Sequence, residues 1–329
     1  MTRHTAISTA PRPSAYSFGQ IAFLGMSVFS LALILRNPQL AITYMSRGLQ
    51  LCVRTVIPSL FPFMVLSELL VLSGAARPLG RLLSRPLRWL FGMEGEGGCA
   101  LLLGLFCGFP VGTKCAVSLY RRGQLDKSQL SHLLTFCNIP SSAFLISAVG
   151  LALFGDRRIG ILLYVTTLLS SLLIGFFGKF FRSRSASPPP VTEAAAPVGS
   201  GVSLFTGAIT SSALSMLSIC AFVVFFTTLS GTLEHLLTAL RIPQAVSVLL
   251  YGILELTGGV ARAASLASPA SLYLCAFFAG WSGLSVHFQI MSLCADTGVS
   301  FRPYLVAKLA HGLLNAALLV LCHLLFDWI

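Results

Sequence analysis

The chain has 329 residues, of which 55% are hydrophobic and only 10% are charged, and its mean hydropathy is +0.85. This balance excludes a soluble globular domain and predicts an all-α polytopic membrane protein. The formal net charge is +12, but the basic residues lie in short segments and at the ends of apolar runs. That distribution fits membrane topology and lipid headgroups, and it gives no indication of nucleic-acid binding.

The chain begins with a polar tail at 1–17, followed by an apolar segment at 18–36 that ends in arginine. No small-residue cleavage site follows this segment, so we predict a retained signal-anchor helix. A first membrane repeat is predicted at 41–181. It opens with an apolar stretch at 41–73 that is long enough for one kinked span.

An amphipathic stretch comes next, in which Arg77, Arg81, Arg85 and Arg88 fall along one helical face and leucines occupy the others. This pattern is typical of an interfacial helix on an anionic membrane surface. It is also the strongest positive-inside signal in the chain, which places it on the cytoplasmic side.

The segment from Gly104 to Lys114 places helix breakers and a charge directly behind a short apolar run. Residues 101–111 provide about 11 apolar-rich positions, whereas a spanning helix needs ~20. Pro110 removes a backbone donor, and the glycines weaken the helix further. Irregular backbone at membrane depth must be buried in protein or line a watery cavity. We predict a re-entrant or broken helix, with a kinked structural helix as the alternative because glycine and proline are common in membrane helices.

A short polar helix should follow, because Asp126 and Gln129 are spaced as a capping box. A second polar break at 136–142 precedes another apolar run, and 159–181 is a clear span. The segment 182–202 is rich in proline, alanine and glycine, so we interpret it as a linker between two membrane halves.

The second membrane repeat, predicted at 203–329, has the same order of elements as the first. Aligning Gly104 with Gly252 places Lys114 opposite Arg262 in a second short, glycine-interrupted run. Counting long apolar segments gives about seven transmembrane helices and two short re-entrant segments. The positions of the basic segments make the two halves run in opposite directions. Such inverted repeats are typical of transporters with a site near the bilayer midplane.

Few polar residues lie at membrane depth, and each is a candidate for a solute site or pathway. Glu255 is the foremost candidate, because an intramembrane carboxylate could bind a cation, a proton or a solute hydroxyl. It could instead pair with a backbone donor or an arginine. Ser282, Ser285 and Gln289 share one helical face and could line a cavity, although small residues also serve helix packing. The candidate site residues are Gly108, Pro110, Gly112, Lys114, Asn138, Ser141, Ser142, Glu255, Thr257, Gly258, Gly259, Ser282, Ser285, His287 and Gln289.

Charged residues near the two broken segments add a further expectation. Lys114 and Arg262 should reinforce the positive field of the half-helix N-termini toward an anionic or polar solute. Glu68 could pair with either cation or contact the solute. The GxSxG, HExxH and Walker patterns are absent, and the nine cysteines lack zinc-site spacing. We therefore expect no enzyme activity, no metal and no cofactor.

Six motifs follow one another between Met45 and Ala316: Pro58-Ser-Leu-Phe-Pro62-Phe, Gly108-Phe-Pro-Val-Gly112-Thr-Lys114, Tyr120-Arg-Arg-Gly123, Phe136-Cys-Asn138, Leu254-Glu255-Leu-Thr257 and Ser282-Gly-Leu-Ser-Val-His287-Phe-Gln289. Their succession resembles the YlbJ-type sporulation integral membrane proteins. That group belongs to the Gate, or nucleoside-recognition, superfamily, which includes the membrane part of the ferrous-iron transporter and resembles concentrative nucleoside transporters. Ile139 and Gly258 stand where the family usually has asparagine.

The resemblance implies a multi-pass protein of the inner cell membrane, or of a sporulation-stage membrane, that moves a small polar solute, nucleoside-like or other, in endospore formation. The alternative is a non-transporting membrane scaffold for sporulation or envelope assembly, in which the hairpin at 121–134 and the helix at 77–88 matter more than Glu255. The expected partners are the lipid bilayer and the solute. A coupling cation or proton and a homo-oligomer are left open.

Overall fold

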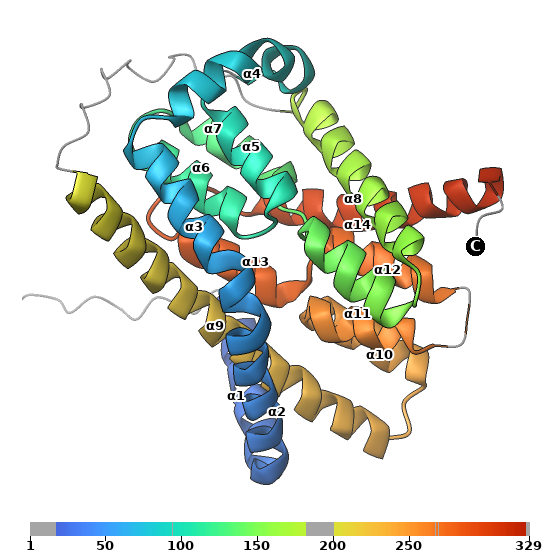
Figure 1. Cartoon of the computed structure of the whole chain (residues 1–329). Coiled ribbons are helices and arrows are strands. Elements are labelled where there is room, and N and C mark those ends of the chain that lie inside the picture. The colour runs from blue at the N-terminus through green and yellow to red at the C-terminus, as the bar shows by residue number, and fades with distance from the viewer. Residues whose placement is uncertain (1–17, 94, 182–200, 267, 269, 327–329) are drawn as a thin grey trace, which may run out of the picture.

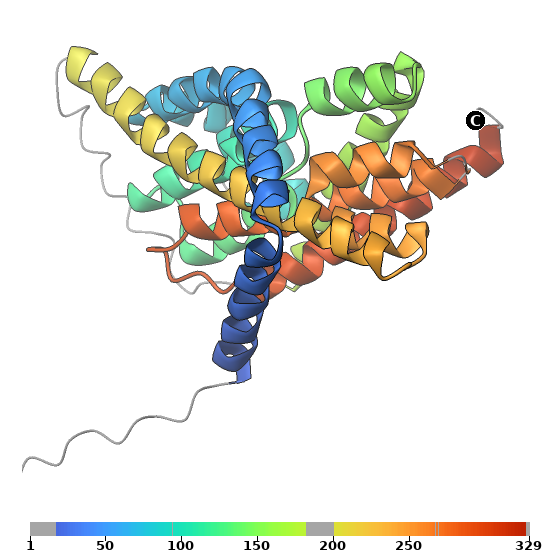
Figure 2. The same cartoon turned by 90° about the horizontal axis from the view of Figure 1, so that it is seen from below.

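The computed structural model describes residues 18–326 except 94, 182–200, 267 and 269 (Figure 1). The predicted tail at 1–17 and nearly all of the predicted linker therefore lie outside the described residues. The described residues form helices and no strand. The predicted signal-anchor segment is one helix, α1 (Phe18–Arg36), which protrudes from the other helices in Figure 2 and contacts α2 and α9.

The helices follow the order of the predicted segments. The first half continues with α2 (Pro38–Leu51), the π-helical η1 (Cys52–Val56), α3 (Ile57–Leu72), α4 (Ala76–Phe91), α5 (Gly97–Phe106), α6 (Val111–Arg121), α7 (Lys127–Phe136), the π-helical η2 (Phe144–Leu153) and α8 (Arg157–Gly178). The second half contains α9 (Gly201–Ala239), α10 (Gln244–Leu254), α11 (Leu256–Ala264), α12 (Ala270–Trp281), α13 (Gly283–Leu293) and α14 (Arg302–Phe326).

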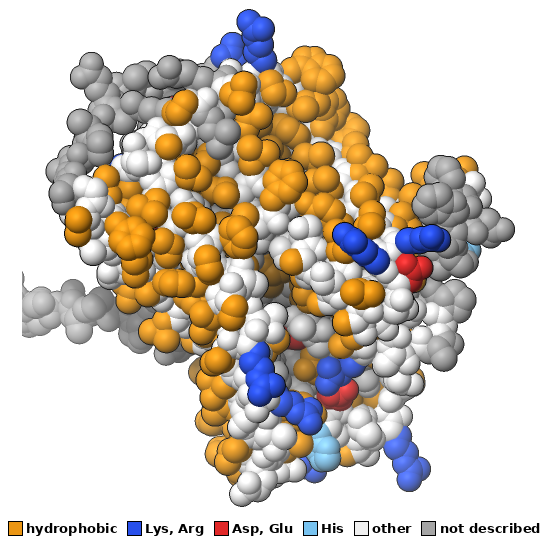
Figure 3. All heavy atoms as spheres, viewed as in Figure 1, with side chains coloured by type: hydrophobic (Ala, Val, Ile, Leu, Met, Phe, Trp, Pro, Cys, Tyr) orange, Lys and Arg blue, Asp and Glu red, His pale blue; other side chains and the backbone are white. Residues whose placement is uncertain are grey.

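The prediction of an all-α polytopic membrane protein is confirmed. Five segments among the described residues are long and apolar enough to cross a membrane, where the sequence suggested about seven. The run after the second break forms the shorter η2 instead. Figure 3 shows hydrophobic side chains over most of the upper and middle part of one face, with Lys and Arg in small groups toward its edges. The five segments are Pro38–Leu72, Arg157–Gly178, Gly201–Ala239, Ala270–Leu293 and Arg302–Leu325.

Local signals in the sequence set several helix ends. The predicted capping box starts α7: Gln129 N donates to Asp126 Oδ1 at 2.6 Å, and Asp126 N donates to Gln129 Oε1 at 3.0 Å. The amphipathic α4 ends at Gly92, whose φ of 63° is the left-handed conformation that terminates many helices. Lys179 Nζ donates to the Trp89 carbonyl at 3.0 Å and so joins the end of α8 to α4.

Each half contains a helical hairpin whose two arms cross at a pair of glycines. In the first hairpin, α5 and α6, a Cβ on Gly112 would lie 2.5 Å from Gly104 Cα. In the second, α10 and α11, a Cβ on Gly259 would clash with Gly252 Cα. The arms of the first hairpin have 10 and 11 residues, or about 15 Å each, which is half of a ~30 Å hydrocarbon core. Both predicted broken segments are therefore hairpins rather than kinked helices.

An interrupted helix and then a long helix follow each hairpin. The interrupted helix is α7 with η2 in the first half and α12 with α13 in the second, and α8 and α14 are the long helices. The helix α7 packs against α14, and α12 packs against α8. Each half thus contacts the last helix of the other. The opposite orientation of the two halves stays a prediction.

Candidate functional site

A small cavity of about 80 Å³ lies where the tips of both hairpins meet the long helices. Phe109 of the first tip contributes to its wall, and Glu255 and Thr257 come from the second tip. Ser285 and Gln289 of α13 complete a polar side. The volume holds water but no drug-sized solute, because pockets for such molecules measure about 300–1,000 Å³. The apolar walls are Leu51, Val56, Leu60, Ile219, Val223, Leu256 and Val286.

Glu255 joins the two arms of the second hairpin. Its extended backbone, with φ −142° and ψ 123°, ends α10 and begins α11. Its Oε1 accepts from Thr257 N at 2.9 Å and its Oε2 accepts from Gly258 N at 2.6 Å. The carboxylate therefore caps the positive end of α11 and also lies on the cavity wall. The sequence left open whether Glu255 would bond a backbone donor or contact a solute. In the structure its carboxylate accepts from backbone donors and lies on the cavity wall as well.

The polar cluster on α13 divides into two parts. Ser285 and Gln289 share a face as predicted, and Gln289 Nε2 donates to Ser285 Oγ at 3.3 Å. Ser282 does not share that face, because its φ of 76° interrupts the helix that the sequence predicted to be continuous. His287 lies outside the cavity lining and instead hydrogen-bonds Tyr304 Oη through Nδ1 at 2.8 Å.

The two interrupted helices accommodate the two hairpin tips. At the second tip, a Cβ on Gly283 would lie 3.0 Å from the backbone nitrogen of Leu256. At the first tip, a Cβ on Gly108 would lie 2.6 Å from Ser141 N. Phe109 N then donates to the Ile139 carbonyl at 2.9 Å. Each break thus leaves room for a hairpin tip at membrane depth. The first break also offers the Ile139 carbonyl as an acceptor for the tip.

Asn138 is buried and connects three helices at the first break. Thr113 Oγ1 on α6 donates to Asn138 Oδ1 at 2.6 Å. Asn138 Nδ2 donates to the Leu134 carbonyl at 3.0 Å, and the Asn138 carbonyl accepts from Lys308 Nζ on α14 at 2.9 Å. Both the amide oxygen and the amide nitrogen are therefore hydrogen-bonded within the protein, and Asn138 does not line the cavity.

The other residues at the first break and hairpin have local roles. Pro110 precedes α6, and Ser141 Oγ accepts from Phe144 N at 3.2 Å at the start of η2. Ser142 is half-buried beside it and does not line the cavity. In the second hairpin, Gly258 lies against the ring of Tyr251.

The two cations that were expected to create a positive field are paired elsewhere. Lys114 Nζ lies 3.5 Å from Glu68 Oε2 on α3 and donates to Ser211 Oγ on α9 at 2.9 Å. Arg262 forms an ion pair with Glu234 on α9 and covers the Tyr251 ring. Neither cation lines the cavity, and Glu68 is the partner of Lys114 rather than a solute contact. In both halves the outgoing hairpin arm is therefore joined by an ion pair to a long helix.

A buried polar row on α14 was missed in the sequence. Tyr304, Lys308, His311 and Asn315 are each at most 1% exposed. Their spacing of four, three and four residues places them on one helical face, and this spacing in an otherwise apolar span could have revealed them. Asn315 Nδ2 donates to Thr167 Oγ1 on α8 at 2.9 Å, so the row ties α14 to its neighbours.

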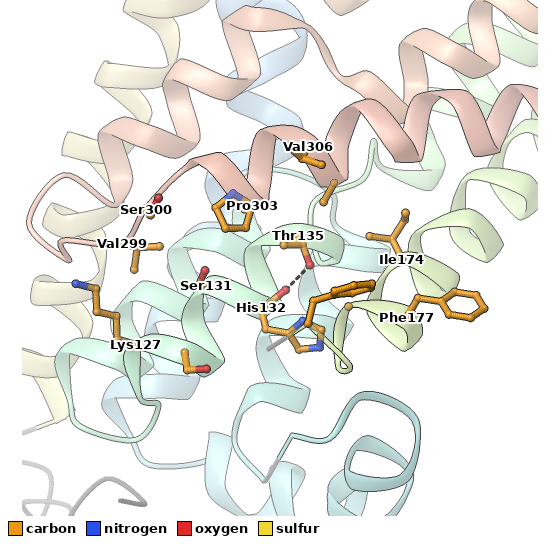
Figure 4. Close-up of a pocket in the computed structure, with 14 residues that line it drawn as sticks. Lys127, Ser131, His132, Thr135, Ile174, Phe177, Val299, Ser300, Pro303 and Val306 are labelled. Carbon is orange, nitrogen blue, oxygen red and sulfur yellow. Dashed lines mark hydrogen bonds between the residues drawn. The ribbon is translucent and has the colours of Figure 1, made fainter. Parts of the chain in front are cut away.

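A larger groove of about 690 Å³ lies between α7, α8 and the start of α14 (Figure 4). Ile174, Phe177 and Val306 give it mostly apolar walls, and Phe177 and Val306 are exposed. The Thr135 hydroxyl in this groove donates to the His132 carbonyl of its own helix at 2.6 Å (Figure 4). Exposed apolar walls of this kind are typical of a surface that contacts lipid or another protein.

Fold and site together define a polytopic α-helical membrane protein built around two helical hairpins. Residues 53–157, which include the first hairpin and the first break, match the Gate family, described as nucleoside recognition. The chain is similar to the sporulation integral membrane protein YlbJ of Bacillus subtilis (strain 168), with 27% identity over 89% of this chain and 80% of that relative. These matches confirm the resemblance predicted from the motifs. No solved structure matches the chain.

Proposed function

We propose that this protein moves a small polar solute across a cell membrane during endospore formation, and that the solute binds between the two hairpin tips. The convergence of both tips on one cavity carries this proposal, because paired interrupted segments mark the midplane site of many transporters. The link to spore formation rests on the name of the B. subtilis relative.

The lining of the cavity indicates which solute chemistry it favours. Glu255 presents carboxylate acceptors, and Ser285 and Gln289 offer both donors and acceptors. The nearby cations are neutralised by Glu68 and Glu234. An uncharged or cationic solute with hydroxyl or amine donors therefore fits better than an anion. Since the cavity is small, the hairpin tips must separate to admit a solute of nucleoside size.

The scaffold alternative needs an exposed surface for a partner protein, and the structure leaves less of it than the sequence suggested. It relies on the hairpin at 121–134 and on the helix at 77–88, yet Leu130, Leu133 and Leu134 of α7 are fully buried. The helix packs against α14 and α8 instead of standing free. What remains for a cytoplasmic partner is the turn around Arg121 and the outer side of α4, where Leu82 and Trp89 are exposed.

Thermal unfolding of the purified protein, with added solutes, tests the proposal. The panel contains nucleosides, nucleobases, amino acids, phosphorylated metabolites and monovalent cations. A solute at 100 times its dissociation constant should add about 2.7 kcal/mol of stability. Glu255→Gln and Gln289→Ala should abolish the stabilisation, whereas Glu96→Gln, an acid outside the cavity, should retain it. Stabilisation that survives both cavity variants would place the solute elsewhere, and no stabilisation by any compound would favour the scaffold.

A further inference from the structure

Lys308 carries a buried ammonium group that has no carboxylate partner among the described residues. It is 1% exposed within the α14 span, and its Nζ contacts the Asn138 carbonyl at 2.9 Å and His311 Nδ1 at 3.3 Å. The ion pairs found among the described residues all belong to other cations. An uncompensated charge at membrane depth is costly, and such residues mark ion pathways and proton relays.

The hydrogen bonds of His311 define which of its nitrogens carries the proton. Its Nε2 lies 3.0 Å from the Thr167 carbonyl, which can only accept, so Nε2 bears the hydrogen. The neutral ring then directs the lone pair of Nδ1 at Lys308 Nζ. A proton can pass from Nζ to Nδ1, which leaves an amine and an imidazolium and changes no other bond. The two side chains thus hold one proton between them.

The surroundings of this pair contain no acid that would fix its charge. His311 and Tyr304 lie within about one turn of Lys308 on α14, Cys137 directly precedes Asn138 at the first break, and His287 of α13 hydrogen-bonds Tyr304. The described part of the chain places no Asp or Glu beside it. The proton can therefore leave without stranding a buried carboxylate.

The contact with Asn138 connects the proton to the first hairpin. Asn138 also accepts from Thr113 on α6, and the next carbonyl, that of Ile139, accepts from Phe109 at the hairpin tip. A hydrogen bond from an ammonium is roughly twice as strong as one between neutral groups. Loss of the proton therefore weakens the support of the break against which the tip rests.

We propose that Lys308 and His311 form a proton-binding site, and that the bound proton is the ion coupled to the movement of the first hairpin. The coupling role rests on the proposed transport function, whereas the proton binding stands without it.

Nitrogen NMR of the full chain, labelled with ¹⁵N-lysine in lipid nanodiscs, tests the proton binding directly. The chain has only four lysines, Lys114, Lys127, Lys179 and Lys308, so each Nζ signal can be assigned by substitution. Lys308→Met supplies the assignment, and Lys308→Arg serves if the Met variant does not fold. We expect the Lys308 signal alone to change from the ammonium to the amine shift within the pH range where the protein stays folded. We also expect the pH at which this change occurs to shift in His311→Gln.

An ammonium signal from Lys308 at every pH, or a change that His311→Gln leaves unaffected, would overturn the proposal. The surface lysines Lys127 and Lys179 are the internal controls.

Hydrogen exchange of the backbone amides at 104–114 tests the link to the hairpin. After correction for the intrinsic effect of pH, the protection factors should fall several-fold in wild type when Lys308 loses its proton. They should stay constant over the same pH range in Lys308→Met. Equal behaviour of both proteins would reject the coupling. If a solute binds but Lys308 stays charged at every pH, this inference is rejected and the proposed transport function is not. If Lys308 titrates but no solute binds, the proton site stands and only the transport function is left unsupported.

Discussion

Gly112 faces Gly104 so closely that a Cβ on Gly112 would lie 2.5 Å from the Gly104 Cα. The same relationship recurs between Gly259 and Gly252 in the second half of the chain. At both crossings two half-length helices lie in backbone contact. This contact sets the position of both hairpin tips and therefore of the cavity between them.

The glycine crossing predicts that Gly112→Ala destabilises the protein. The added methyl group meets backbone on the facing arm, so the arms must separate, and overpacking of this kind costs about 1–3 kcal/mol. Gly207→Ala in α9 is the control, because nothing lies within 4 Å of its Cβ position. Thermal unfolding should show a lower midpoint for Gly112→Ala and little change for Gly207→Ala. Equal midpoints would mean that the arms are not in contact.

The buried ion pair of Lys114 and Glu68 predicts strong coupling between the two residues. Glu68→Gln leaves the Lys114 ammonium with only uncharged partners and should cost about 3–5 kcal/mol. Lys114→Met combined with Glu68→Leu should cost less than the sum of the single changes, because no charge is left uncompensated. A double-mutant cycle from unfolding measurements gives the coupling energy. Additive effects would show that the two charges do not interact.

The hydrogen bond of Thr113 to Asn138 predicts a loss of stability at the first break. Thr113→Val conserves shape but leaves Asn138 Oδ1 buried without its donor, which costs about 1–3 kcal/mol. Thr113→Ser keeps the hydroxyl and should lose much less. Unfolding midpoints of the two variants provide the comparison, and a larger loss for serine than for valine would contradict the role of the hydroxyl.

The pair of Arg121 and Asp296 predicts a weak dependence of stability on acid. Arg121 Nε donates to Asp296 Oδ2 at 2.9 Å, and this hydrogen bond holds the pKa of the Asp296 carboxyl below its usual value. Because the folded-state pKa is lowered, the pair stabilises the protein above about pH 4, the ordinary pKa of aspartate. That stabilisation is lost as the pH falls through the folded-state value. Both side chains are more than half exposed, so the effect should be at most about 1 kcal/mol.

Comparing wild type with Asp296→Asn over a pH series measures this effect. The difference in unfolding midpoint should shrink toward zero as the solution becomes acidic. A difference that persists after Asp296 is protonated would have to come from something other than the ion pair.

The sequence by itself determined the membrane class, the interruption of both short apolar segments and the start of α7, because their signals are local. An apolar run shorter than a bilayer, closed by glycine, proline and a charge, cannot be a simple span wherever it packs. The Asp126 capping box likewise acts within one turn of helix. The break at Ser282 escaped prediction, because no proline marks it and its left-handed backbone is set by the hairpin tip beside it.

Only the tertiary structure decided which buried charges meet. Lys114 and Arg262 looked like parts of a solute site, but long helices elsewhere in the chain supply their acids. The contact of Lys308 with the Asn138 carbonyl joins residues 170 positions apart. Periodicity within α14 can show that Lys308 faces inward, but it cannot identify the carbonyl that it meets. At membrane depth a charge is tolerated only through its partner, and that partner is chosen by how the two halves pack.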